Sequence, residues 1–117
     1  MLDELTFGEF VAVKRKQTGI SLGEFSRKTG LSPSYCSNVE SGKRPAPAGD
    51  TQELFALILR LDDDEKIHMY DLAAKTKKQG TLPYDIVLYL NNDREILCFL
   101  RRVNRLGLEG QDLLKLI

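Results

Sequence analysis

Apolar residues recur every three or four positions along most of the chain, and short polar or glycine-containing stretches separate the periodic segments. This spacing is typical of helices that bury one face, and we find no convincing strand pattern. Four segments open with Ser, Thr or Asp followed three residues later by Glu, which is the pattern of a capping box. The pattern predicts an all-α fold, with helices over residues 6–18, 21–29, 32–41, 50–61, 62–77, 84–90, 93–106 and 113–117.

The polar stretch Lys77-Lys78-Gln79-Gly80-Thr81 is typical of a linker. It predicts a helical domain over residues 1–78 and a C-terminal helical extension over residues 79–117. One face of the helix over 93–106 is apolar and carries Ile96, Phe99, Leu100, Val103 and Leu106. Two interpretations stay open: this face packs against the domain, or it forms a dimer contact.

The helices over 21–29 and 32–41 are both short, and only Gly30-Leu31-Ser32 separates them. Two short helices joined by a turn of this length with a glycine form the helix-turn-helix unit, and Gly30 permits a positive φ at the bend. Where the two helices must cross, the residues are apolar or small: Leu22, Phe25, Ser26, Leu31, Cys36 and Val39. On pattern alone, an ordinary corner between two helices fits as well as a DNA-binding unit.

Charge changes this picture only when its distribution is considered. The 117 residues carry no net charge, with 42% hydrophobic and 29% charged residues, as is ordinary for a globular protein. Between residues 14 and 44, however, seven basic residues stand against two acidic ones. DNA binding requires a basic face and not a basic protein, so the composition permits a nucleic-acid partner.

Other functions find little support in the sequence. There is no apolar run long enough for a membrane span and no secretory signal, so we expect a cytoplasmic protein with no membrane partner. Cys36 and Cys98 lack metal-ligand spacing and are expected to be free, buried thiols. We expect no cofactor. His68 and the pair Lys14 and Lys16 are expected on solvated surfaces, with phosphate contact as the alternative for the lysines. No nucleophile–base pair is present, so we expect no enzyme.

The residues from Ile20 to Pro45 carry a more specific pattern. It combines a polar cap at Ser21, the pair Phe25-Ser26, the turn Gly30-Leu31-Ser32 and the run Val39-Glu40-Ser41-Gly42-Lys43-Arg44-Pro45. Together these elements resemble the phage repressor/Cro-type (XRE) helix-turn-helix family. The resemblance covers residues 6–77 and implies a five-helix lambda-repressor-like DNA-binding domain.

The resemblance also implies a set of site residues. The helix after Ser32 would enter the major groove, and the helix before it would cross the DNA backbone. Matching positions assign base readout to Pro33, Ser34, Ser37 and Asn38. They assign phosphate contacts to Ser21, Tyr35, Lys43 and Arg44. They further imply a partly buried ion pair between Arg15 and Glu40 that orients the recognition helix.

Three departures from the family pattern bear on affinity and on the DNA sequence bound. Leu22 stands where the family often has a glutamine that contacts phosphate. Gly23 lowers helix stability by roughly 1 kcal/mol relative to alanine. The recognition helix contains no Arg or Lys, which argues against guanine readout.

These observations lead to the expectation of a homodimeric transcriptional regulator, in the first place a repressor, that binds an inverted-repeat operator in double-stranded DNA. The alternative is a protein-interaction module, such as an antitoxin or an anti-repressor, that acts on a toxin or another protein partner. The absence of basic residues from the recognition helix keeps this alternative open.

Overall fold

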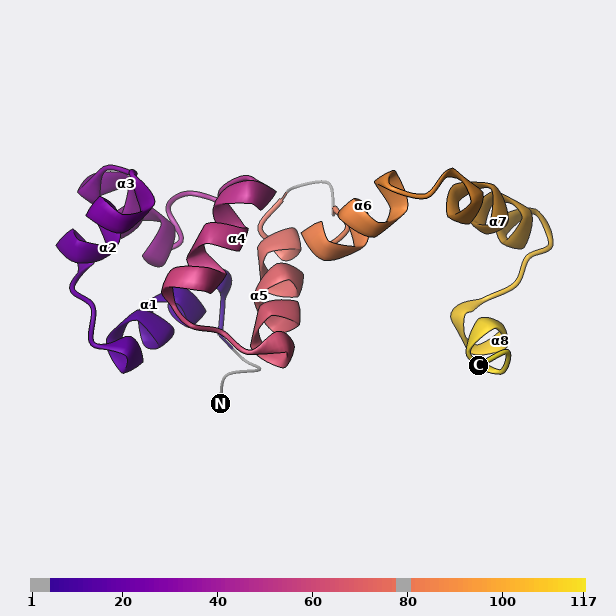
Figure 1. Cartoon of the computed structure of the whole chain (residues 1–117), viewed down its shortest axis with the longest axis horizontal. Coiled ribbons are helices and arrows are strands. Elements are labelled where there is room, and N and C mark those ends of the chain that lie inside the picture. Colours follow the sequence, from indigo (N-terminus) through magenta and orange to yellow (C-terminus); the bar gives the residue numbers. More distant parts are fainter. Residues whose placement is uncertain (1–4, 78–80) are drawn as a thin grey trace. The chain divides into compact units, whose positions relative to one another are not determined.

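A computed structural model describes residues 5–77 and 81–117 and shows eight helices and no strand within them (Figure 1). The prediction of an all-α fold is therefore confirmed. The helices are α1 (Phe7–Thr18), α2 (Leu22–Thr29), α3 (Pro33–Glu40), α4 (Gly49–Ile58), α5 (Asp63–Lys75), α6 (Tyr84–Asn91), α7 (Arg94–Arg105) and α8 (Gly110–Leu114). None of the described helices has the length and apolar character needed to cross a membrane.

The chain divides into two compact units, Met1–Tyr84 and Asp85–Ile117, which are described separately. Tyr84 is the last residue of the first unit, and its ring packs there, with its centroid 5.9 Å from that of Tyr70. A Cβ atom added to Gly49, at the start of α4, would lie only 1.8 Å from the Tyr84 ring. Glycine is therefore needed at position 49 for this contact.

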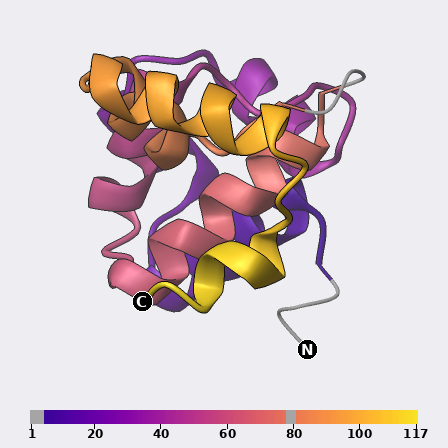
Figure 2. The same ribbon diagram turned by 90° about the vertical axis from the view of Figure 1, so that its right-hand side faces the viewer.

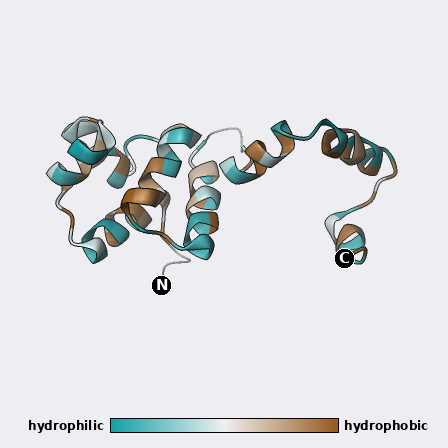
Figure 3. Cartoon of the chain, viewed as in Figure 1, coloured by the Kyte–Doolittle hydropathy of each residue, from teal (hydrophilic) through white to brown (hydrophobic). Residues whose placement is uncertain are grey.

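In the first unit, α1–α5 gather around one hydrophobic core (Figures 1 and 2). The C-terminal half of α4 is among its most hydrophobic parts (Figure 3) and places Phe55, which is 0% exposed, at the centre. The Phe55 ring meets Phe25 of α2 edge to face at 4.9 Å and lies 6.4 Å from Phe7 of α1. Aromatic pairs at such distances add to the stabilisation that burial provides. The core thus fixes α1, α2 and α4 around one residue.

Side-chain caps define several helix starts, as the sequence indicated. The capping boxes Thr6–Glu9 and Asp62–Glu65 are both complete at the starts of α1 and α5. The Asp50–Glu53 box was predicted wrongly, because the residue that precedes α4 is Ala48, two positions before Asp50. Asp50 therefore lies inside the first turn, where its carboxylate accepts a hydrogen bond from the Thr51 amide at 2.9 Å.

Two predicted surface residues are instead part of the packing between α1 and α5. Lys14 is only 9% exposed and forms an ion pair with Glu65, so the prediction of a solvated Lys14 was wrong. His68 is half-buried, and its ring meets Phe10 edge on at 5.4 Å. The helical pattern marks both residues as polar positions, but it does not reveal that a neighbouring helix covers them.

In the second unit, α7 is amphipathic and Asp93 caps its first turn by accepting from the Glu95 and Ile96 amides. Val103 is buried, whereas Phe99 and Leu106 on the same face are 44% and 68% exposed. Cys98 lies on the opposite, polar face and is exposed, so the expectation that both thiols are buried holds only for Cys36. The last helix, α8, begins three residues earlier than predicted.

Candidate nucleic-acid interface

The turn between α2 and α3 is set by local backbone and cap geometry. Gly30 adopts φ +74°, a left-handed conformation that a side chain disfavours. The Ser32 hydroxyl then accepts a hydrogen bond from the Tyr35 amide at 3.1 Å, and Pro33 occupies the first helical position. Proline is favourable there because its missing N–H would have no partner. These two features end α2 and start α3 within three residues.

The crossing of α2 over α3 depends on small and apolar side chains. Ser26 is buried, and its hydroxyl donates to the Leu31 carbonyl of the turn. Phe25, Cys36 and Val39 are each 1% exposed and fill the space between the helices. Burial is the main reason that the pKa of the Cys36 thiol is raised. Cys36 is therefore a neutral packing residue at neutral pH.

The opposite face of α3 is polar and open to solvent. Pro33, Ser34 and Ser37 are exposed, and Asn38 is half-buried. No charge lies on this face, and the two hydroxyls and the carboxamide can both donate and accept hydrogen bonds. Such groups can pair with the edges of bases in a major groove. The structure thus brings the four residues that the sequence predicted for base readout onto one surface of α3.

Arg15 joins α1 to the C-terminal end of α3. Its Nε donates to Glu40 Oε2 at 2.7 Å and its Nη2 donates to Glu40 Oε1 at 3.1 Å, so the ion pair is bidentate. Its Nη1 also donates to the Ile20 carbonyl, at 2.9 Å, in the segment between α1 and α2. The Arg15 and Glu40 side chains are only 11% and 13% exposed. One guanidinium thus fixes three segments around the recognition helix.

Gly8, in the first turn of α1, is a supporting residue that the sequence reasoning missed. A Cβ atom at this position would lie 2.3 Å from the Val39 carbonyl oxygen and 2.6 Å from that of Glu40. The first turn of α1 therefore lies directly against the backbone at the end of α3. The signal available in the sequence was a glycine between Phe7 and Phe10 in the first turn of a predicted helix, because glycine inside a helix is unfavourable unless packing requires it.

The loop after α3 carries the two exposed cations of the predicted phosphate contact, Lys43 and Arg44. The Arg44 amide donates to the Asn38 carbonyl at 3.2 Å, and its guanidinium carbon lies 5.3 Å from the centre of the Tyr35 ring. The half-buried Tyr35 packs in turn against the core. The Tyr35 ring therefore supports the Arg44 guanidinium, which gives Tyr35 a positioning role in addition to its predicted phosphate contact.

The same loop is attached to the end of α5. The Ala46 amide donates to Thr76 Oγ1 at 2.9 Å, and Lys77 Nζ donates to the Ala46 carbonyl at 2.8 Å. No sequence motif marks Thr76 or Lys77 as partners of this loop, since they follow it by thirty residues. They hold its backbone near the recognition helix.

Ser21 lies apart from these cations, at the start of α2. Its exposed hydroxyl accepts from the Glu24 amide at 3.1 Å, which leaves its own O–H free to donate. Among the described contacts none joins Ser21 to Lys43 or Arg44. The candidate phosphate contacts therefore lie before α3 at Ser21, within α3 at Tyr35, and after α3 at Lys43 and Arg44.

The short α2, its glycine turn and the exposed polar face of α3 together define a helix-turn-helix protein. A family model described as a helix-turn-helix domain matches residues 6–69, which is more than half of the 117 residues. The chain belongs to this helix-turn-helix domain family. The match spans α1 to α4 and part of α5, and it is consistent with the resemblance to phage repressor/Cro-type regulators. Searches of curated proteins and of solved structures found no match.

Proposed function

We propose that this protein is a sequence-specific DNA-binding transcriptional regulator, and that it represses transcription by occupying a promoter. The observation that carries the proposal is the exposed, hydrogen-bonding face of α3, with Ser34 and Ser37 exposed and Asn38 half-buried. The buried Arg15–Glu40 pair supports this helix from behind, as a rigid reading element requires.

In the proposed complex α3 lies in the major groove, with its N-terminal turn nearest the bases. Asn38 pairs with adenine, because its carboxamide matches the N6 and N7 positions. Pro33 contacts a thymine methyl group, and the hydroxyls of Ser34 and Ser37 contact polar base edges. Because α3 carries no cation, we expect an operator that is read at A·T pairs more than at guanine.

Lys43, Arg44, Tyr35 and Ser21 bind phosphates in this proposal. Contacts of this kind supply affinity and register without sequence information. A homodimer would present two α3 helices roughly 34 Å apart, which matches one turn of DNA and an inverted-repeat operator. The exposed Phe99 and Leu106 support a dimer contact in the C-terminal extension.

A protein-interaction module remains the competing proposal, as an antitoxin or an anti-repressor. The uncharged surface of α3 favours it, since phosphate attraction by the recognition helix itself is absent. Under this proposal the polar face of α3 contacts a protein partner.

Selection of bound sequences from a random duplex pool tests the main proposal. We expect an enriched inverted repeat, and binding of that duplex that weakens steeply as the salt concentration rises. Lys43→Ala and Arg44→Ala should each lower the slope of log affinity against log salt by about 1, because each loses one phosphate contact. Lys66→Ala on α5 is the matched control and should leave the slope unchanged. Failure to enrich any sequence, with binding indifferent to salt, would favour the protein-interaction module.

A further inference from the structure

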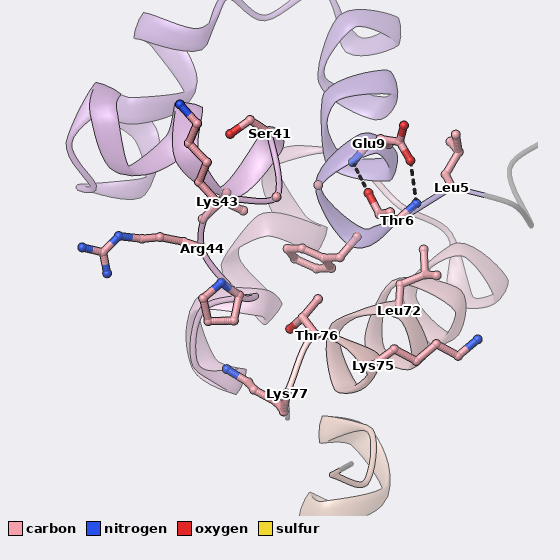
Figure 4. Close-up of a pocket in the computed structure, with 15 residues that line it drawn as sticks. Leu5, Thr6, Glu9, Ser41, Lys43, Arg44, Leu72, Lys75, Thr76 and Lys77 are labelled. Carbon is pink, nitrogen blue, oxygen red and sulfur yellow. Dashed lines mark hydrogen bonds between the residues drawn. The ribbon is translucent and has the colours of Figure 1, made fainter. Parts of the chain in front are cut away.

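A groove of about 1020 Å³ lies in the first unit beside the loop that follows α3 (Figure 4). Its walls are the start of α1, the end of α3 at Val39, residues 41–45 of the loop and the C-terminal end of α5. The groove thus adjoins both the predicted phosphate-binding loop and its attachment to Thr76 and Lys77. The base-reading residues of α3 do not line it.

The chemistry of this groove is amphipathic. Its apolar residues are the half-buried Leu5, which packs against the core, and the core residues Phe7, Val39 and Leu72, which are at most 6% exposed. Its rim carries four cations, Lys43, Arg44, Lys75 and Lys77, against one carboxylate. That carboxylate, Glu9, already accepts a hydrogen bond from the Thr6 amide at 3.0 Å.

Two of these cations are available to a ligand without breaking an existing interaction. Lys43 and Lys75 are exposed and form no ion pair within residues 5–77 and 81–117. Figure 4 shows the Arg44 guanidinium and the Lys75 ammonium pointing outward from the rim. Rotation of such long, solvated side chains toward a bound anion requires no change in the fold.

We propose that this groove binds a small amphipathic anion, a carboxylate attached to an apolar body. The apolar part would lie against the lining, and the carboxylate would meet the cations of the rim. A cation of the same shape would be repelled by the rim, and a bare phosphate would leave the apolar lining unused.

Binding here would act on DNA recognition, an extension that rests on the proposed function. Lys43 and Arg44 line the groove and are also the predicted phosphate contacts, so a bound carboxylate would compete with DNA for the same cations. The expected effect is a lower affinity for DNA when the groove is occupied, and by reciprocity a lower affinity for the anion when DNA is bound.

The direct test is a titration of the 117-residue chain with octanoate, followed by amide NMR, with octylammonium as the charge-reversed probe. We expect saturable shifts at amides that line the groove, notably Gly8, Gly42 and Thr76, for octanoate and weaker effects for octylammonium. Shifts scattered over the exposed apolar residues of α7, equal shifts with the two probes, or no saturable shifts would each overturn the proposal.

Lys75→Glu separates this groove from other sites, because Lys75 is exposed and makes no described hydrogen bond on which folding depends. Reversing one charge near the bound carboxylate should weaken octanoate binding by about tenfold. Lys16→Glu, at the far end of α1, is the matched control and should leave octanoate binding unchanged. Equal effects of the two variants would show that only overall charge matters and would overturn the proposal.

The effect of octanoate on DNA binding is tested with the duplex enriched from the random pool. Octanoate should weaken duplex binding by the wild-type chain, and this effect should be lost in Lys75→Glu. Unchanged duplex binding at saturating octanoate would overturn the competition step. Because the NMR titration contains no DNA, failure of the DNA-binding proposal would be visible separately from failure of the groove proposal.

Discussion

Arg15 shows how one side chain can position a recognition element. It binds both carboxylate oxygens of Glu40 and the carbonyl of Ile20, so α1, the following segment and α3 cannot move independently. Replacing such a pair by packed apolar residues is often neutral, whereas removing one partner leaves a desolvated charge. We therefore assign the Arg15–Glu40 pair to orientation more than to net stability.

This assignment predicts a strong effect for Glu40→Gln. The variant should lower the free energy of unfolding by about 3 kcal/mol, because the guanidinium stays largely buried without its counter-charge. Urea unfolding of both single variants and of Arg15→Gln combined with Glu40→Gln measures the coupling energy in a double-mutant cycle. Strictly additive losses in that cycle would contradict a direct pair.

Glu65 makes stability depend on pH. The hydrogen bond from Lys14, and next that from the Asp62 amide, lower the pKa of Glu65 below its ordinary value of 4.5. A carboxyl whose pKa is lower in the folded state stabilises the fold above its unfolded pKa, and this contribution is lost as the pH falls through the folded pKa. The ion pair with Lys14 therefore matters at neutral pH and fades in acid.

Glu65→Gln keeps a capping side chain but removes the charge that faces Lys14. We expect it to lower the free energy of unfolding by about 1 kcal/mol at neutral pH, and by less as the pH falls below 4.5. Urea unfolding at several pH values measures this difference. The exposed neighbour Asp64 supplies the control Asp64→Asn, for which a loss of about 0.5 kcal/mol or less is expected. A penalty for Glu65→Gln that stays constant into acid would contradict the linkage.

At the scale of elements, two helical glycines have opposite roles. Gly8 permits α1 to touch the backbone of α3, whereas a Cβ added to Gly23 of α2 would meet only the Arg27 side chain, at 3.6 Å, and the Ser21 hydroxyl, at 4.0 Å. The space around the added Cβ atom therefore decides whether alanine raises or lowers the free energy of unfolding. The same substitution becomes a test of the packing between α1 and α3.

Gly23→Ala should raise the free energy of unfolding by about 1 kcal/mol, because alanine is the better helix former. Gly8→Ala should lower it by about 3 kcal/mol, because carbonyl oxygens of α3 occupy the space of the new methyl group. Thermal unfolding of the two variants and of the wild type measures whether each substitution raises or lowers the stability. A neutral Gly8→Ala would mean that α1 and α3 can separate without loss.

The starts of α1, α2, α3 and α5 followed from the sequence, because a Ser, Thr or Asp cap precedes each of these helices. Thr6, Ser32 and Asp62 each accept the amide hydrogen bond that their position predicts. The start of α4 did not follow, because Ala48 provides no side-chain cap and the helix begins by packing Gly49 beneath Tyr84. Local hydrogen bonds are encoded by neighbouring residues, whereas this start depends on a residue thirty-five positions away.

At the scale of the whole molecule, we assign the contact of the proposed homodimer to residues of the second unit, Asp85–Ile117. The extension exposes Phe99, Leu106 and several leucines beyond them. Such apolar surface is unfavourable in water and is common at sites of self-association. The extension is therefore the part of the chain to which we assign dimerisation.

Truncation after Tyr84, the last residue of the first unit, should give a monomer that binds the operator more weakly, because a dimer engages two half-sites at once. Sedimentation measures the mass, and duplex titration measures the affinity. Lys115→Ala in the intact chain controls for a change of charge in the extension and should leave the dimer unchanged. A truncated chain that still sediments as a dimer would place the contact in the first unit.

The sequence by itself determined that the chain is helical, where most helices begin, and that a glycine turn separates α2 from α3. These properties depend on residues a few positions apart, through helical periodicity and capping hydrogen bonds. Only the tertiary structure decided that Glu65 pairs with a buried Lys14, that His68 packs on Phe10, that Gly8 must be small, and that Thr76 and Lys77 hold the loop after α3. Periodicity indicates which face of a helix is covered, but the neighbour that covers it depends on how distant segments pack.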